Sequence, residues 1–62
     1  MKIGFIGLGN VGSKLAGSLL RNGVDLSVFD LNSQLVEKFA SKGAGIGEDP
    51  AHLMRLCDLV IT

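Results

Sequence analysis

The 62-residue sequence contains no tryptophan and no tyrosine, and only one cysteine, one proline and one histidine. A single cysteine cannot form an internal disulfide, which excludes a small disulfide-held fold and indicates a reducing compartment such as the cytoplasm. Basic and acidic side chains balance at six each, which argues against nucleic acid or an anionic membrane as a partner. No apolar run approaches the roughly 18 residues of a membrane span. We therefore expect a soluble, cytoplasmic protein.

The sequence does contain apolar segments of two alternating periods. Short apolar runs at residues 3–6, 26–29 and 59–61 are typical of strands buried on both faces. Residues 11–21 and 33–42 have the periodicity of amphipathic helices, residues 50–56 form a shorter helix, and residues 44–47 leave room for a short strand. This alternation predicts a Rossmann-type, doubly wound α/β fold with a parallel sheet.

Several apolar side chains are expected to face the core. Val11, Leu15 and Leu19 recur every four residues and predict the buried stripe of the first helix. Ala16 and Leu20 widen this stripe. Phe39 and Met54 are assigned to the apolar faces of the second and third helices.

Two helix starts carry capping residues. Asn32 is the expected N-cap of the second helix, and Asp49 that of the third, with Pro50 at the first helical position. Leu31 precedes Asn32, and we expect it to pack on Val36 as a hydrophobic staple.

Three glycines lie where the first strand pattern changes to a helix pattern. Gly7 can take the turn, Gly9 leaves no side chain between the backbone and a phosphate, and Gly12 lets the helix lie close to the strand. A helix N-terminus presents N–H groups and about half a positive charge to an anion. The motif predicts a pyrophosphate site formed by Gly7, Leu8, Gly9, Asn10, Val11 and Gly12. The alternative is a tight strand-to-helix connection without a ligand.

A carboxylate ends the second strand. Asp30 follows Gly9 by 21 residues, close to the spacing of about 20 for the acid that binds the adenosine ribose. Such a carboxylate repels the 2′-phosphate of NADP, and Leu31 and Asn32 offer no guanidinium to bind it. Asp30 and Leu31 therefore predict NAD rather than NADP. The alternative for Asp30 is a turn or cap residue.

A second glycine cluster does not predict a nucleotide site. Glu48 and Asp49 follow Gly43, Gly45 and Gly47, and two carboxylates there would repel a pyrophosphate. We interpret this segment as a loop.

Four segments resemble the N-terminal part of the β-hydroxyacid dehydrogenases, a family that includes 3-hydroxyisobutyrate dehydrogenase and 6-phosphogluconate dehydrogenase. They are IGFIGLGNVG (3–12), VFDLN (28–32), KGA (42–44) and CDLVIT (57–62). The resemblance implies an NAD(P)-dependent oxidoreductase that interconverts a small 3-hydroxy acid and its semialdehyde or keto form. It also implies that Gly7–Gly12 wrap the pyrophosphate and that Asp30 and Leu31 meet the adenosine ribose.

The resemblance further implies that residues 1–62 are the N-terminal part of a dinucleotide-binding domain. The rest of that domain, and the helical domain that binds substrate and forms a homo-oligomer, would lie beyond Thr62. No catalytic residue is assigned, because Lys14, Lys38 and Lys42 have the pattern of surface lysines. No metal site is predicted either, because His52 lacks ligand partners at a suitable spacing.

Two alternatives to a hydroxyacid dehydrogenase stay open. One is a dinucleotide-binding module without chemistry of its own. The other is a reductase of a cyclic imine or keto acid, although the pyrroline-5-carboxylate reductases that this stretch resembles tend to have alanine at the position of Gly12.

Overall fold

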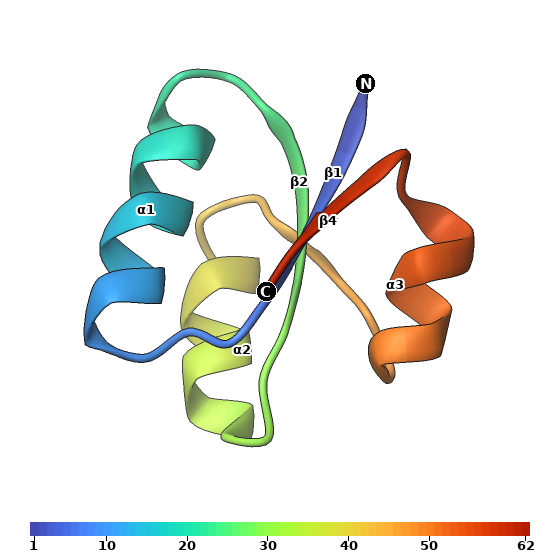
Figure 1. The fold of residues 1–62 in the computed structure, drawn as a ribbon. Helices are drawn as coiled ribbons and strands as arrows, with labels where there is room; N and C mark the ends of the chain where they lie inside the picture. Colours follow the sequence, from blue (N-terminus) through green and yellow to red (C-terminus); the bar gives the residue numbers. More distant parts are fainter.

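The computed structural model describes all residues, Met1–Thr62, as alternating strands and helices (Figure 1). In chain order they are β1 (Lys2–Ile6), α1 (Asn10–Arg21), β2 (Asp25–Phe29), α2 (Ser33–Ala40), β3 (Gly45–Ile46), α3 (Pro50–Leu56) and β4 (Leu59–Ile61). The predicted order of elements is confirmed, and the boundaries differ from the predicted ones by at most two residues.

The four strands form one parallel sheet in the order β3-β2-β1-β4. Helices α1 and α2 cover one face of the sheet and α3 covers the other (Figure 1). The predicted doubly wound α/β fold is thus confirmed. In the register of β1 and β2, Ile6 lies opposite Phe29, so both strands end at the same edge of the sheet.

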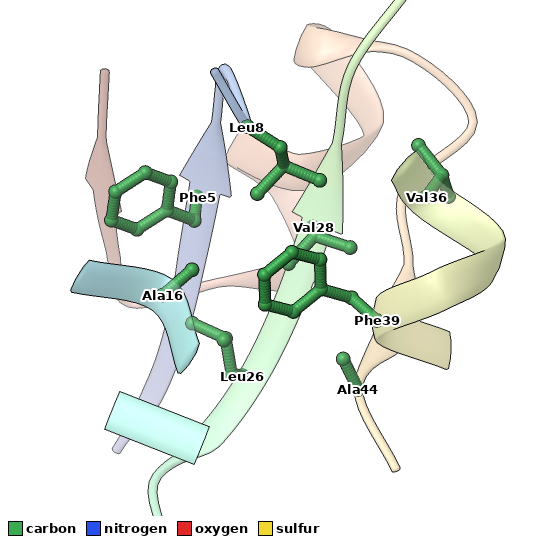
Figure 2. Packing of buried hydrophobic residues seen from close by; sticks show 8 residues of the cluster. All are labelled: Phe5, Leu8, Ala16, Leu26, Val28, Val36, Phe39 and Ala44. Atoms are coloured by element: carbon green, nitrogen blue, oxygen red, sulfur yellow. The ribbon is translucent and has the colours of Figure 1, made fainter. Parts of the chain in front are cut away.

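The main core lies between the sheet and helices α1 and α2 (Figure 2). Strand β2 is central to it, since Leu26 and Val28 are almost fully buried. Phe39 of α2 packs into the same cluster, as predicted. The complete cluster is Phe5, Leu8, Ala16, Leu26, Val28, Val36, Phe39 and Ala44.

Helix α1 buries only one side of its predicted apolar stripe. Val11 is 82% exposed and Leu15 47% exposed, so the prediction that they are buried is wrong. Ala16 is fully buried, as predicted, and Leu19 and Leu20 pack partly against the core. The reason is a close approach of Gly12 to the end of β1, which turns the Gly12–Ala16 line toward the sheet. Val11 and Leu15 each precede that line by one residue and are rotated from it by about 100°.

Helix α3 packs through Leu53, which is fully buried. A Cβ at Gly47 would overlap the Leu53 side chain, so this glycine lets α3 lie close to the segment that follows β3. Met54 is 62% exposed, and its assignment to the core is wrong because the Leu53 contact turns the next side chain outward.

Cys57 links α3 to β4, and its thiol is half-buried. The sulfur lies 3.1 Å from the position of a Cβ built on Gly4 of β1. Burial raises the pKa of the Cys57 thiol, and the positive charge of Lys2 opposes that shift. The thiol is therefore protonated at neutral pH, which is typical of a cysteine that packs in the structure and is not reactive.

The packing of α3 predicts a large loss of stability for one substitution and almost none for its neighbour. Leu53→Ala should lower the free energy of unfolding by about 2–5 kcal/mol, because it leaves a cavity in a closed site. Met54→Ala is the matched control and should change it by less than about 0.5 kcal/mol. Urea unfolding followed by circular dichroism measures both, and equal losses would contradict this packing.

Candidate functional site

The loop that joins β1 to α1 is held against β2 and the core. Gly7 has φ +94°, a left-handed conformation that strains any other residue. Its N–H donates a hydrogen bond to the carbonyl oxygen of Phe29, at 3.0 Å. The Leu8 side chain is 1% exposed and belongs to the core cluster. The loop therefore has a defined shape although it is rich in glycine.

Gly12 lies in the first turn of α1, against the carbonyl oxygen of Gly7. A Cβ at Gly12 would overlap that oxygen and lie 3.4 Å from the Phe5 ring. The close packing of helix on strand that the sequence predicts for Gly12 is present. It brings the N-terminus of α1 directly to the carboxyl end of β1.

The N-terminus of α1 has no side chain in front of it. Gly9 is the N-cap residue, with φ −66° and no side-chain capping bond, and the first turn contains no acidic residue. A Cβ added at Gly9 would have no protein atom within 4 Å. The N–H groups and the positive end of the helix dipole thus face open space, which suits an anion such as pyrophosphate.

The Asp30 carboxylate lies against the same loop. Its Oδ2 accepts a hydrogen bond from the Leu8 N–H at 2.6 Å, and its Oδ1 accepts one from the Asn32 N–H at 2.8 Å. The Leu8 bond, and then the Asn32 bond, lower the pKa of the Asp30 carboxyl, while partial burial opposes them. Asp30 is therefore ionised at neutral pH. The bond to Leu8 joins residues 22 positions apart, and no local sequence signal reveals it.

A cleft of about 230 Å³ opens beside the loop at the carboxyl edge of β1 and β2. It is lined by Ile6, Gly7, Phe29, Asp30 and Leu31. Ile6 and Phe29 are absent from the predicted site. Each is the last residue of its strand, and the two strands pair in parallel, so the two residues lie opposite each other at the same edge of the sheet. This position is the signal that could have identified them.

Leu31 lies at the rim of this cleft and is 95% exposed. The predicted staple between Leu31 and Val36 is therefore wrong, and Val36 packs in the core cluster instead. The Asp30–Asn32 hydrogen bond closes a tight turn that leaves Leu31 outside. The cap itself is as predicted, because Asn32 Oδ1 accepts from the Gln34 N–H at 3.0 Å.

The predicted site residues divide into two adjoining groups. Gly7, Asp30 and Leu31 line the cleft. The remainder form the loop and the first turn of α1, where the side chains of Asn10 and Val11 are exposed. This second group consists of Leu8, Gly9, Asn10, Val11 and Gly12.

A larger cleft of about 290 Å³ lies at the other end of α1, lined by Gly17, Leu20, Arg21 and Lys42. Arg21 is in the last turn of the helix, where a cation complements the negative end of the helix dipole. None of the predicted site residues lines this larger cleft.

The second glycine cluster leads into a helix that is capped by its own side chain. Asp49 Oδ1 accepts from the His52 N–H at 2.7 Å, which confirms the predicted cap. His52 Nδ1 in turn accepts from the Glu48 N–H at 3.0 Å. The segment is a loop, as interpreted, apart from the two residues of β3.

The chain contains no group of three or more His, Cys, Asp or Glu side chains placed to bind a metal ion. None of its helices combines the length and the apolar character needed to cross a membrane.

A parallel sheet, a glycine turn into a helix N-terminus and a carboxylate at the end of the next strand define a dinucleotide-binding domain of the Rossmann type. Comparison with known families agrees with this class, since residues 2–62 match the NAD binding domain of 6-phosphogluconate dehydrogenase. The chain belongs to this family. The resemblance to the β-hydroxyacid dehydrogenases is confirmed.

Curated relatives match nearly the whole chain. A probable mitochondrial 3-hydroxyisobutyrate dehydrogenase of Dictyostelium discoideum is 38% identical over 60 residues, 97% of this chain and 19% of that protein. The 3-sulfolactaldehyde reductase of Escherichia coli K12 is 42% identical over 60 residues, 97% of this chain and 20% of that protein. The human cytokine-like nuclear factor N-PAC is 36% identical over 58 residues, 94% of this chain and 10% of that protein. The chain thus spans about a fifth of the length of the first two relatives.

The fold also matches solved structures. An imine reductase from a Pseudomonas species superposes with a TM-score of 0.88 at 24% identity, over 95% of this chain and 20% of that one. At this identity the likeness supports the Rossmann-type fold alone.

The open space in front of Gly9 predicts the result of adding a side chain there. Gly9→Val should weaken NADH binding at least about tenfold, because the side chain would occupy the space before the helix N-terminus. Helical content should change little, since no protein atom lies within 4 Å of the added Cβ. NADH fluorescence titration and circular dichroism measure the two effects.

The control for this substitution is Gly17→Ala. Its added Cβ meets only the end of the flexible Arg21 side chain, at 3.3 Å, and it lies far along α1 from the loop. Gly17→Ala should leave the affinity for NADH unchanged. Undiminished affinity in Gly9→Val would exclude the proposed anion site.

Proposed function

We propose that residues 1–62 are the N-terminal part of the NAD-binding domain of a longer oxidoreductase. Its reaction interconverts a small 3-hydroxy acid and the corresponding semialdehyde or keto compound. The observation that carries the proposal is the meeting of the glycine loop, the N-terminus of α1 and the Asp30 carboxylate at one edge of the sheet. The names of the Dictyostelium and Escherichia coli relatives support the reaction class.

In this proposal the glycine loop and the Asp30 carboxylate bind different groups of the cofactor. The backbone from Gly7 to Gly12, including Leu8, Gly9, Asn10 and Val11, holds the pyrophosphate. Asp30 accepts hydrogen bonds from the adenosine ribose, and Leu31 borders the same cleft. The bound nicotinamide supplies the hydride chemistry.

NAD is the proposed cofactor in preference to NADP. The Asp30 carboxyl has a lowered pKa and is ionised at neutral pH. A negative charge at the ribose position repels an added 2′-phosphate, and the neighbouring Leu31 cannot bind one.

The catalytic residues and the substrate contacts belong to the longer protein in this proposal. Hydride transfer to or from a hydroxy acid needs a proton donor or acceptor within hydrogen-bond reach of the substrate oxygen. None is assigned within residues 1–62. We place it, together with a domain through which the protein forms a homo-oligomer, in the chain that follows.

The cytoplasm is the proposed location, because the lone half-buried thiol suits a reducing compartment. The Dictyostelium relative is named as mitochondrial, which makes that organelle the alternative. Cell fractionation with an antibody against the protein distinguishes the two.

A second candidate function is a dinucleotide-binding module without its own chemistry. One observation favours it: the human relative N-PAC is named as a nuclear factor rather than as a dehydrogenase. This module would use the same loop and the same Asp30, and would lack turnover.

The mass of the intact polypeptide and an activity screen decide between the two candidates. We expect an intact mass several times the 6.5 kDa of these residues. We also expect the protein to reduce NAD when it is given a small 3-hydroxy acid, which is measured as a rise in absorbance at 340 nm. A mass near 6.5 kDa would exclude dehydrogenase activity for this molecule. A long chain that binds NADH but turns over none of the acids would favour the binding module.

The choice of cofactor has its own test. The double substitution Asp30→Ser and Leu31→Arg should shift the ratio of NAD to NADP affinity toward NADP by about tenfold or more, since it replaces a repulsive charge with an attractive one. Titration with both reduced nucleotides measures the ratio. The single substitution Leu31→Ala, which keeps the carboxylate, is the control and should retain the preference for NAD. An unchanged ratio in the double variant would contradict the role of Asp30.

A further inference from the structure

Both oxygens of the Asp30 carboxylate are bonded to the protein itself. Oδ2 accepts from the Leu8 N–H at 2.6 Å, and Oδ1 accepts from the Asn32 N–H at 2.8 Å. A residue that served only to meet a ribose would not need to reach the backbone on each side of it. The contacts instead make Asp30 a bridge between the glycine loop and the start of α2.

The bond to Leu8 lies at the point where it constrains the loop most. Leu8 is between the left-handed Gly7 and the N-cap Gly9, two residues with no side chain to fix them. The preceding N–H, of Gly7, is bonded to the carbonyl oxygen of Phe29 at 3.0 Å. Two consecutive loop N–H groups are thus tied to the end of β2, one through backbone and one through the carboxylate.

We propose that Asp30 is a positioning residue that holds the glycine loop in its anion-binding shape before any nucleotide binds. This role rests on the nucleotide site proposed above and adds to the ribose contact. A charge-assisted hydrogen bond is about twice as strong as a neutral one. A loop already held in shape loses less conformational freedom when it binds.

The affinity for inorganic pyrophosphate distinguishes the positioning role from a role in ribose binding alone. Inorganic pyrophosphate has no ribose, so a residue that acts only on the ribose cannot favour its binding. Coulomb's law alone says that neutralising Asp30 should strengthen the binding of an anion nearby. If Asp30 positions the loop, the same neutral substitution weakens it.

The experiment uses Asp30→Asn in the full-length protein. Asparagine keeps the size of the side chain but carries an NH2 group in place of one carboxylate oxygen. Because Leu8 and Asn32 donate to different oxygens of Asp30, one of these two N–H groups would face a donor instead of an acceptor. Displacement of bound NADH by inorganic pyrophosphate gives the affinity for pyrophosphate, and direct titration gives that for NADH. We expect Asp30→Asn to weaken pyrophosphate binding about tenfold and to weaken NADH binding as well.

Asn32→Ala is the matched control. It removes the side-chain cap on α2, which accepts from the Gln34 N–H, but it keeps the backbone N–H that donates to Asp30. It should leave the affinity for pyrophosphate within about twofold of the unsubstituted protein. An equal loss in Asn32→Ala would mean that the effect comes from a weakened α2, and would overturn the proposal.

A second measurement reports on the loop without any ligand and without a variant. Hydrogen exchange of the Leu8 amide, followed with ¹⁵N-labelled leucine and glycine, should be at least about tenfold slower than that of the exposed Gly9 amide after correction for intrinsic rates. Equal protection factors for the two amides would overturn the proposal even if Asp30→Asn failed to fold.

The outcomes separate this proposal from the proposed function. Unchanged or tighter pyrophosphate binding with weaker NADH binding in Asp30→Asn would overturn the positioning role and leave the nucleotide site intact. Failure of the unsubstituted protein to bind NADH would overturn the nucleotide site, and the positioning role with it.

Discussion

The contact between Gly12 and the carbonyl oxygen of Gly7 is the constraint on which the rest of the structure depends. It brings α1 so close to the end of β1 that a Cβ at Gly12 would overlap that oxygen. It also turns the Gly12–Ala16 line of α1 toward the sheet, so that Ala16 is fully buried. One close approach therefore sets the packing of the helix and brings its positive end to the edge of the sheet.

Parallel pairing of β1 and β2 brings the groups of the candidate nucleotide site together at that edge. Because Ile6 lies opposite Phe29, the residues that follow the two strands emerge side by side. The Gly7 N–H reaches the Phe29 carbonyl, and the Leu8 N–H reaches the Asp30 carboxylate. In an antiparallel pair the carboxyl ends of the strands would lie at opposite edges, and this carboxylate could not meet the loop.

Local patterns in the sequence were enough to predict the elements, the two N-caps and the glycine turn, because each depends on residues close in the chain. Predictions failed where packing between elements decides. The exposure of Val11 and Met54 depends on how α1 and α3 are rotated by glycine contacts elsewhere. The exposure of Leu31 follows from the turn that Asp30 closes. The Leu8–Asp30 bond is a third case, since it exists only once β1 and β2 are paired.

A glycine loop raises a physical difficulty that the surrounding contacts resolve. Each glycine loses more backbone freedom on folding than other residues, roughly 0.5–1 kcal/mol relative to alanine, yet an anion site needs fixed N–H groups with nothing in front of them. Burial of the Leu8 side chain anchors the middle of the loop from the core side. The Phe29 carbonyl and the Asp30 carboxylate anchor it from the side of β2. The N-terminus of α1 thereby stays open in front while its supports lie behind and beside it, so the loop combines a fixed shape with an unobstructed approach for a phosphate.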